Sequence, residues 1–526
     1  MEELQWKNVK QLIEEKAAKN GSRAFMHFED QVVSYREIHE KSNMVGNNLK
    51  KLGIKKGENV LVFLFNSVEY VILWFALAKL GAVMVPINTA SKRHDLSHVI
   101  MDSAANTIIL ESSLLGNYLE VRSEAKIERE IIIGEGPDDK QGRMIPFEIL
   151  QKGSADDLET DIAVDDPITI IYTSGTTGKP KGVVLPQYAY IQNPFAIMKY
   201  EDLKENDRLF STLPLFHVGA QLLIVLPAMM ADIDFALMKR FSASRFWDQV
   251  RHYRCNVVHY LGSIAQMLLA QTERPDDADN PGERMIGGGI PEKIWEKFER
   301  RFGVKIVEAY GLTECGGVSV HNPVHKVKVG SIGLPVAHQR VEIVDENDRM
   351  VGPMVKGEIV IRPEIPFTTM LGYYKNPGAS MEACRNLWFH TGDYGYKDEE
   401  GYIYFLGRAA YFIRRRGENV SPEEVEGVIN THPGVEESCV VGVPSEMGDE
   451  DVKAYVVRKG TVELLPEDII KWCEEQISYF KIPRYIEWVD SLPKTATNRV
   501  ERHKLKQAGI GESWDRDRSG YHLKRK

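Results

Sequence analysis

The sequence predicts an α/β protein in which helices cover sheets. Between Trp6 and about Asp161, short apolar runs typical of buried strands alternate with helical patterns, and the connections are short. Strand, helix and strand joined in this way favour a parallel sheet covered by helices. At 526 residues the chain is also too long for one ordinary hydrophobic core, so we expect about two to four folding units.

The clearest unit of this kind lies near the N-terminus. Asn59–Phe65 has the pattern of a buried strand, Val68–Leu80 that of a helix and Gly81–Pro86 that of the next strand. Ser154–Asp166 is acidic and poor in apolar residues. We expect it to form a loop that leads into the strand after it.

Composition narrows the class of protein. Hydrophobic residues make up 43% of the chain and charged residues 27%, as in soluble globular proteins. The net charge of −10 disfavours a nucleic-acid partner as the main function. Five scattered cysteines without metal-binding spacing predict reduced thiols in a cytoplasm: Cys255, Cys315, Cys384, Cys439 and Cys473.

We expect neither a signal peptide nor an integral membrane segment. The chain starts with the acidic run Met1–Gln5, and no apolar segment of signal-peptide type follows. Its most apolar stretch, Val71–Ile87, contains Lys79, Gly81 and Pro86, which favours a core helix running into a strand over a membrane span. The sequence leaves a homodimer open.

The most informative stretch is Tyr172–Gly182, directly after the predicted strand Ile168–Tyr172. It contains three glycines, four Ser or Thr residues and two lysines in eleven positions. Glycine allows backbone N–H groups to approach a ligand, hydroxyls donate to phosphate oxygens and lysine adds positive charge. We interpret the stretch as a loop that binds the polyphosphate of a nucleotide.

This loop is not a Walker loop. Gly175 and Gly178 are two residues apart instead of four, and Pro180 follows Lys179 where a Walker motif has Ser or Thr. Val183–Leu185 has the pattern of a strand, so the loop is expected to link two strands. The alternative for so short a pattern is a Gly- and Thr-rich surface turn.

A second motif, Ala309–Glu314, follows the predicted strand Val304–Val307. Tyr310 offers a face for stacking on adenine, Thr313 a hydroxyl for phosphate and Glu314 an oxygen ligand for Mg²⁺. The alternative is a turn after a strand with an incidental acid. Gly287–Gly289 would allow backbone to lie flat against a planar ligand, although a triple glycine is equally a flexible turn.

These motifs resemble those of the adenylate-forming superfamily, which contains acyl-CoA synthetases, aryl-CoA ligases, luciferases and nonribosomal adenylation domains. The resemblance runs from about Glu58 to Lys506, with seven motifs in the expected order. It implies that a carboxylate attacks the α-phosphorus of ATP to give an acyl-adenylate and pyrophosphate. In the ligases, the thiol of coenzyme A then displaces AMP.

The resemblance adds further site residues. His217, in the predicted apolar strand Leu213–Ala220, matches the aromatic residue that gates the acyl pocket, although a lone His at a strand end is usually a partner within the fold. Asp393, at the end of Trp388–Asp393, matches the carboxylate that accepts the ribose hydroxyls. Gly372–Asn376 matches another signature of the family.

The resemblance also places the domain boundary. It implies a large N-terminal domain of helix-covered sheets, residues 1–407, and a small mobile α+β C-terminal domain, residues 408–526. Arg408 would contact ribose and Ala410 would be the hinge, although Ala410-Tyr411 departs from the usual Lys or Asp followed by Asp. Arg416 and Gly417 would meet the phosphates and pantetheine arm of CoA, and a solvated edge is the alternative for these arginines.

The motif Leu492–Arg499 departs from the family at its end. A lysine that bridges the carboxylate and the α-phosphate usually follows a glycine there, whereas this chain has Asn498-Arg499. We expect Arg499 to keep the charge with a different shape. The alternative cation is a lysine nearby, namely Lys494, Lys504 or Lys506.

The sequence therefore predicts an acid–CoA ligase that uses ATP, Mg²⁺ and coenzyme A. The predicted catalytic residues are His217, Thr313, Glu314 and Arg499, with Glu314 also holding the metal. The predicted cofactor-binding residues are Thr173, Ser174, Gly175, Thr176, Thr177, Gly178, Lys179, Lys181, Gly288, Gly289, Tyr310, Asp393, Arg408, Arg416 and Gly417.

Two rival functions remain open. One is an adenylation enzyme that feeds a carrier protein, and the other is a non-catalytic nucleotide-binding relative. The small-molecule acid itself is not readable from the sequence. The general pattern is similar to short- or medium-chain and crotonobetaine/carnitine-type ligases.

Overall fold

The structure is a computed structural model of the whole chain. It describes residues 4–124, 126–136, 144–173, 180–408, 411–415, 418–445, 450–460, 462–477, 479, 481–495 and 499–523. The chain divides into two compact units. The first comprises Met1–Ile290, Lys297–Val341 and Ile361–Phe389, and the second comprises Pro291–Glu296, Glu342–Val360 and His390–Lys526.

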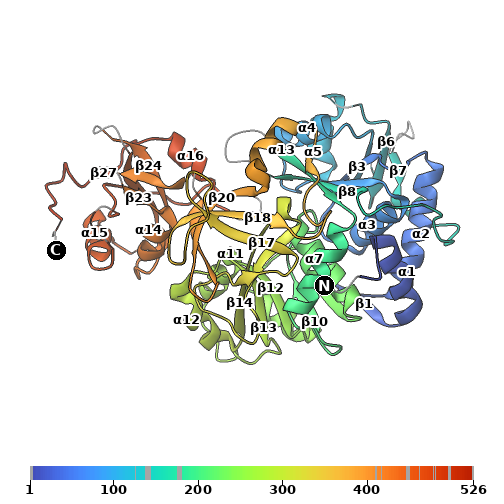
Figure 1. Cartoon of the computed structure of the whole chain (residues 1–526), viewed down its shortest axis with the longest axis horizontal. Helices are drawn as coiled ribbons and strands as arrows, with labels where there is room; N and C mark the ends of the chain where they lie inside the picture. Colours follow the sequence, from blue (N-terminus) through green and yellow to red (C-terminus); the bar gives the residue numbers. More distant parts are fainter. Residues whose placement is uncertain are drawn as a thin grey trace. The chain divides into compact units, whose positions relative to one another are not determined.

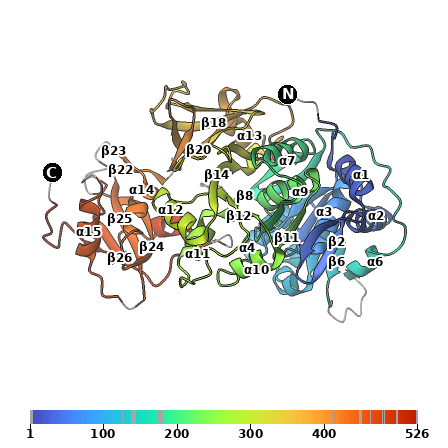
Figure 2. The same cartoon turned by 90° about the horizontal axis from the view of Figure 1, so that it is seen from below.

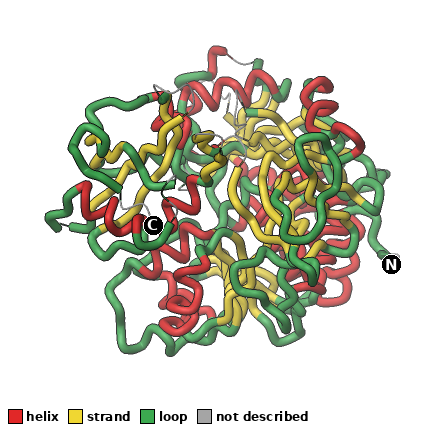
Figure 3. The backbone as a smooth tube through the Cα atoms, turned by 60° about the vertical axis from the view of Figure 1, so that its left-hand side comes forward, coloured by secondary structure: helices red, strands yellow, loops and turns green. Residues whose placement is uncertain are grey.

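Two large sheets form the frame of the first unit, and Figure 3 shows helices packed against their strands. Among the described residues, the nine-stranded sheet has the order β16 (Leu334–Pro335), β15 (Gly317–His321), β14 (Lys305–Leu312), β13 (Arg284–Gly288), β12 (Val257–Leu261), β10 (Arg208–Ser211), β11 (Asp234–Leu237), β1 (Ala24–Phe28) and β2 (Gln31–Ser34). The eight-stranded sheet has the order β19 (Gly372–Tyr373), β9 (Lys181–Pro186), β8 (Pro167–Thr173), β4 (Val83–Pro86), β3 (Asn59–Phe63), β5 (Thr107–Glu111), β6 (Arg129–Ile133) and β7 (Met144–Pro146).

The remaining strands form smaller sheets (Figure 1). One sheet has the order β17 (Gln339–Val344), β18 (Gly357–Pro363), β20 (Phe389–Lys397) and β21 (Ile403–Arg408). Another pairs β22 (Ile413–Arg415) with β23 (Glu418–Val420), and the last has the order β24 (Val435–Pro444), β25 (Glu450–Arg458), β26 (Tyr485–Trp488) and β27 (Trp514–Asp515).

The described helices are, in chain order, α1 (Val9–Asn20), α2 (Tyr35–Lys51), α3 (Val68–Leu80), α4 (Arg93–Asp102), α5 (Leu115–Leu119), α6 (Phe147–Leu150), α7 (Ala189–Tyr200), α8 (Val218–Ala220), α9 (Leu226–Met230), α10 (Phe246–Tyr253), α11 (Gly262–Leu269), α12 (Glu292–Phe302), α13 (Pro377–Ala383), α14 (Pro422–Ile429), α15 (Pro466–Glu474) and α16 (Arg502–Gln507). In the part of the chain that is described, no helix is both long and apolar enough to cross a membrane.

Helix α3 belongs to the core of the first unit, since every residue in it except Glu69 is buried. Ser67 caps its N-terminus and Gly81, with φ of 73°, ends it. The Trp74 ring contacts Tyr190 of α7 edge-on, with centroids 6.0 Å apart. Figure 2 shows α7 and α9 beside one another with α3 next to them. The predicted helix Val68–Leu80 and the parallel pairing of its flanking strands β3 and β4 are confirmed.

The second unit has its own core. Strands β24 and β25 pack on α14 and α15 through a cluster of buried aliphatic residues that includes Val425, Val440 and Ile469. Ser421 caps α14 by accepting the N–H of Glu424, and Pro422 follows at the first helical position. The predicted domain division after residue 407, with its mobile C-terminal part, stays a prediction.

The predicted strand Leu213–Ala220 is wrong. Strand β10 ends at Ser211, and α8 begins directly after His217. The backbone between them pairs with a side chain instead of a strand, because Asn66 donates to the carbonyl of Leu213 and accepts the N–H of Leu215. Pro214 has no N–H to offer a sheet.

Candidate active site

Strands β8 and β9 carry the two ends of the predicted phosphate loop. They pair antiparallel, and Thr173 at the end of β8 lies opposite Lys181 at the start of β9. The predicted link between two strands is therefore confirmed. The loop residues Ser174, Gly175, Thr176, Thr177, Gly178 and Lys179 lie outside the described residues.

The carboxylate of Glu314 lies at the edge of this loop. Its Oε1 accepts hydrogen bonds from the Thr173 hydroxyl at 3.4 Å and from the Tyr373 hydroxyl at 3.1 Å. Lys181 Nζ lies 5.0 Å from the centroid of the Tyr373 ring. Burial, followed by the negative charge of Glu314, raises the pKa of Tyr373, so its hydroxyl stays a donor at neutral pH. Three distant segments thus meet at one carboxylate.

This arrangement fits a metal that arrives with the nucleotide. Mg²⁺ is usually held by one or two carboxylates together with phosphate oxygens and water. Glu314 supplies one carboxylate, and two hydroxyls hold its Oε1 in place. Within the described ranges, no group of three or more His, Cys, Asp or Glu side chains has a metal-binding arrangement.

Strand β14 continues further than predicted. It runs through Tyr310 to Leu312, and the short helical turn Thr313–Cys315 follows. Tyr310, Thr313 and Glu314 are all half-buried. The expected end of the strand at Val307 is wrong, because β15 pairs antiparallel with the motif itself. A Cβ on Gly311 would come within 1.9 Å of the Gly317 carbonyl oxygen, so this close pairing requires glycine.

The glycine run at the end of β13 is fixed by its neighbours. A Cβ on Gly287 would lie 2.1 Å from the Tyr260 carbonyl oxygen, and one on Gly288 would lie 2.5 Å from the Ala309 carbonyl oxygen. Gly289 has φ of 92°, a left-handed conformation that favours glycine. The run is therefore held in place on both sides, and flexibility is not the reason for its glycines.

A buried carboxylate beneath this run was missed by the sequence reasoning. Glu308 on β14 is 4% exposed, and it accepts hydrogen bonds from the Tyr260 hydroxyl and from the N–H groups of Gly289 and Ile290. Burial raises the pKa of Glu308 to about 7 against these hydrogen bonds. The available signal was an acid two residues before Tyr310, in an otherwise apolar strand.

The His217 ring is largely buried and lies against a neighbouring aromatic ring. Its ring is tilted against Phe216, with centroids 4.7 Å apart, and its Nε2 has no hydrogen-bond partner among the described residues. Burial lowers the pKa of His217 to about 4, so the ring is neutral at physiological pH. A neutral aromatic ring suits an apolar acyl group.

In the second unit, Asp393 of β20 lies opposite Arg408 of β21. Arg408 Nε donates to Asp393 Oδ1 at 3.0 Å, and Asp393 is 3% exposed. A charge-assisted hydrogen bond of this kind fixes the position of the Asp393 carboxylate.

The guanidinium of Arg499 is close enough to Arg408 and Asp393 for their charges to affect its pKa, although the residue as a whole is exposed. Burial of the guanidinium lowers the pKa of Arg499, the like charge of Arg408 lowers it further, and the negative charge of Asp393 opposes this. Ala410, Arg416 and Gly417 lie outside the described residues.

The three alternative lysines are occupied elsewhere. Lys494 pairs with Glu437 at 2.6 Å, Lys504 with Glu501 at 2.6 Å and Lys506 with Glu450 at 2.7 Å. Each of these lysines thus has a glutamate partner.

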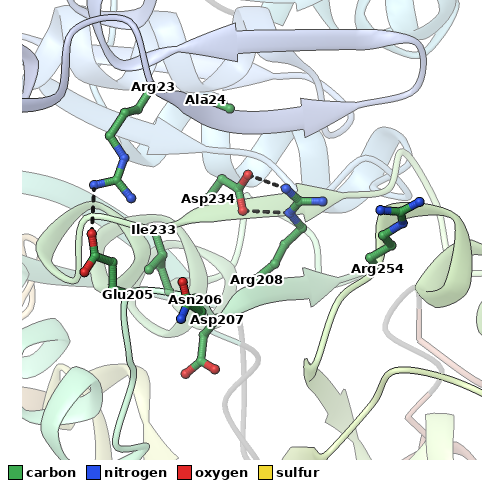
Figure 4. A pocket seen from close by; sticks show the side chains of 9 residues that line it. All are labelled: Arg23, Ala24, Glu205, Asn206, Asp207, Arg208, Ile233, Asp234 and Arg254. Carbon is green, nitrogen blue, oxygen red and sulfur yellow. Dashed lines mark hydrogen bonds and ion pairs between the residues drawn. The ribbon is translucent and has the colours of Figure 1, made fainter.

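The hollow in Figure 4 is not this site. It has a volume of about 470 Å³ and lies at the amino ends of parallel strands, since Ala24, Arg208 and Asp234 are the first residues of β1, β10 and β11. Two hydrogen bonds join Arg208 to Asp234. Ligands of parallel sheets bind at the opposite, carboxyl ends of strands.

Comparisons with known proteins show the family to which the chain belongs. Residues 13–374 match the model of the AMP-binding enzyme family, and residues 424–499 match that of the AMP-binding enzyme C-terminal domain. The crotonobetaine/carnitine–CoA ligase of Salmonella arizonae is 33% identical over 485 residues, covering 91% of this chain and 94% of the relative. The corresponding ligase of Proteus mirabilis is 32% identical over 479 residues, covering 90% and 92%.

Solved structures of CoA ligases are similar to this chain over 95% of its length. The anthranilate CoA ligase AuaEII in complex with anthranoyl-AMP has a TM-score of 0.89 at 26% identity, covering 95% of this chain and 97% of that one. The O-succinylbenzoate coenzyme A synthetase of Bacillus subtilis, in complex with AMP, has a TM-score of 0.82 at 27% identity, covering 95% and 99%. Fold, site and comparisons thus define an AMP-forming acid–CoA ligase. The chain belongs to the AMP-binding enzyme family.

A first prediction concerns Glu314. Glu314→Gln keeps the size of the side chain but removes its charge, and losing one transition-state contact of this kind costs about 10²–10³ in rate. We expect acyl-adenylate formation, measured by ATP–pyrophosphate exchange, to fall by this factor while the melting temperature is kept. Glu58→Gln is a control, since Glu58 is a carboxylate that pairs with Arg129 at 3.2 Å. Normal exchange by Glu314→Gln would remove this residue from the mechanism.

A second prediction concerns stability and pH. The native protein keeps the proton of Glu308 up to about pH 7, whereas the unfolded chain releases it near the ordinary value of 4.5. The contribution of this bound proton to the free energy of unfolding is fully present below pH 4.5. It is lost as the pH rises through 7, and the loss amounts to about 3 kcal/mol.

Glu308→Gln cannot ionise, so its free energy of unfolding should lack this decrease. Urea unfolding of both proteins from pH 4.5 to pH 8 measures the difference between the two curves. Parallel curves would show that Glu308 has the same pKa in the native and unfolded states.

Proposed function

We propose that the chain converts a small carboxylic acid into its CoA thioester in two half-reactions on one nucleotide site. The observation that carries the proposal is the Glu314 carboxylate at the edge of the phosphate loop, where Thr173 and Tyr373 donate to it. At this position the carboxylate would hold Mg²⁺, and the metal would neutralise charge at the phosphates of ATP.

In the first half-reaction, an oxygen of the acid attacks the α-phosphorus and the bond to the bridging oxygen of pyrophosphate breaks. In the second, the sulfur of CoA attacks the acyl carbon, the carbon–oxygen bond to AMP breaks and the thiol proton leaves to solvent. When bound, Mg²⁺ would neutralise phosphate charge and align the departing pyrophosphate.

Different side chains would bind the ATP, the acid and the CoA. Thr173, Thr313 and Lys181 would bind phosphate oxygens, and Tyr310 with the backbone of Gly288 and Gly289 would bound the adenine. Asp393 and Arg408 would hold ribose, and His217 would close the acyl pocket. Residues 174–179 would complete the phosphate contacts, and Arg416 and Gly417 the contacts with CoA.

The second half-reaction needs a different set of groups at the same nucleotide. We propose that residues 408–526 rotate about Ala410 between the half-reactions and bring Arg499 for adenylation. In support, the C-terminal segment has its own hydrophobic core, and lysines 494, 504 and 506 are paired with glutamates. Losing Arg499 should therefore affect one half-reaction more than the other.

The acid remains to be identified, and the relatives narrow the choice. The curated relatives above are named for crotonobetaine and carnitine, and the solved structures for anthranilate and O-succinylbenzoate. The two relatives named for crotonobetaine and carnitine are 32–33% identical to this chain, and the two solved structures are 26–27% identical to it. We propose an aliphatic acid of the crotonobetaine/carnitine type or of short to medium chain length. We place the reaction in a cytoplasm because the five cysteines are free thiols, four of them buried.

The function is tested with a panel of acids that includes crotonobetaine, carnitine, butyrate, benzoate and anthranilate. We expect one aliphatic acid to support ATP–pyrophosphate exchange without CoA, and continuous AMP release only when CoA is added. If the enzyme catalyses exchange but releases AMP only with a phosphopantetheinyl carrier protein and not with CoA, the result would favour an adenylation enzyme that feeds a carrier protein. Nucleotide binding without exchange for any acid would favour the non-catalytic nucleotide-binding relative.

A further prediction concerns Arg499. Arg499→Ala should slow acyl-adenylate formation by about 10²-fold or more, because a charged contact with the transition state is lost. The CoA step, started from preformed acyl-adenylate, should change far less. Arg499→Lys should retain the adenylation rate, since an ammonium group can reach both oxygens. Single-turnover kinetics measure both steps.

Lys494→Ala is the matched control, because it removes a nearby cation that Glu437 already neutralises. Normal adenylation by Arg499→Ala together with a defect in Lys494→Ala would transfer the role to the lysine.

A further inference from the structure

One buried carboxylate holds the glycine run at the end of β13 from beneath. Glu308 Oε2 accepts the N–H of Gly289 at 3.0 Å, and Oε1 accepts the N–H of Ile290 at 2.9 Å and the Tyr260 hydroxyl at 2.5 Å. Both oxygens are used, and Glu308 is 4% exposed. Tyr260 is 1% exposed, so the side-chain part of the network is buried, while the Gly289 N–H lies at its partly exposed edge.

This network sets the path of the backbone where the sheet ends. Strands β13 and β14 pair in parallel up to Gly287, which lies opposite Glu308. Beyond this point Gly289 turns away with φ of 92°. The N–H groups of Gly289 and Ile290 are therefore satisfied by the Glu308 side chain, and buried N–H groups left without an acceptor are costly.

A carboxylate is suited to this position in a way that an amide is not. Its two oxygens can accept all three hydrogen bonds, whereas glutamine has one acceptor oxygen and would turn an N–H group towards one of the three donors. Close packing prevents the run from relaxing freely, because a Cβ on Gly288 would lie 2.5 Å from the Ala309 carbonyl oxygen. A change at Glu308 is therefore transmitted to Gly288 and Gly289.

We propose that Glu308 is a positioning residue that fixes the Gly288–Gly289 backbone as the shared wall of the adenine and acid subsites. This inference rests on the proposed function, which assigns that wall to the nucleotide and the acid. Glu308 acts through the backbone and does not touch the reacting atoms. Its loss should weaken the binding of the nucleotide more than it slows the chemical step.

The test compares Glu308→Gln with a matched buried carboxylate elsewhere. Glu130 on β6 is 5% exposed and accepts hydrogen bonds from Tyr118 at 2.7 Å and from Arg122. It lies next to the edge strand β7, separated from β8 by β4, β3 and β5. Both substitutions weaken a buried network, but only one of these networks supports the glycine run.

We expect Glu308→Gln to raise the Kd for AMP, measured by isothermal titration calorimetry, and the KM for ATP by about tenfold, the factor that corresponds to one lost buried hydrogen bond. The kcat should fall by less than about threefold, and Glu130→Gln should lower only the melting temperature. The proposal would be overturned if the two variants had equal melting temperatures and unchanged affinity for AMP. It would also be overturned if Glu308→Gln lowered the melting temperature and left the AMP affinity unchanged.

Tyr260→Phe provides a milder variant if Glu308→Gln does not fold. It removes one donor to Glu308 and leaves both backbone hydrogen bonds, so we expect the same direction with a smaller rise in the AMP Kd. No rise would contradict the proposal. AMP affinity does not depend on turnover, so failure of every acid to react would reject the proposed function and leave this test in force.

Discussion

The site depends on one contact, the carboxylate of Glu314 with the hydroxyls of Thr173 and Tyr373. These residues belong to the end of β8, the turn after β14 and the short strand β19. Strand β19 pairs with β9, and β9 pairs with β8, so the eight-stranded sheet brings Tyr373 beside the loop. A single negative charge therefore has its place fixed by two hydroxyl donors before any nucleotide arrives.

The direction of the strands explains why the chemistry gathers here. Thr173, Gly288 and Leu312 end β8, β13 and β14, and parallel strands present their carboxyl ends to ligands. The hollow lined by Arg208 and Asp234 lies at the opposite ends of the strands, where the charges neutralise one another.

Much of this arrangement could be predicted from local pattern. The helix Val68–Leu80 is apolar throughout and has clear caps, and the run Tyr172–Gly182 has a composition that few other sites require. The segment around Leu213 was wrongly predicted as a strand because its partner is the side chain of Asn66, which lies 147 residues away in the chain. The spacing of apolar residues in the sequence does not show such a contact between distant residues.

The site was only partly predictable for a related reason. Motifs pointed to Thr173, Glu314 and Asp393, but Tyr373 as a partner of Glu314 emerges only when β19 is placed beside β9. Glu308 was missed because one acid in an apolar strand has no pattern of its own, and its role depends on the backbone of the neighbouring strand.

The central claim is that the acid attacks the α-phosphorus of ATP at the site organised by Glu314. The most direct measurement uses an accepted acid whose carboxylate is labelled with oxygen-18, followed by mass spectrometry of the products. The account predicts that each turnover transfers one labelled oxygen from the acid to AMP and none to pyrophosphate. Unlabelled AMP, or label in pyrophosphate, would contradict an acyl-adenylate and with it this account of the site.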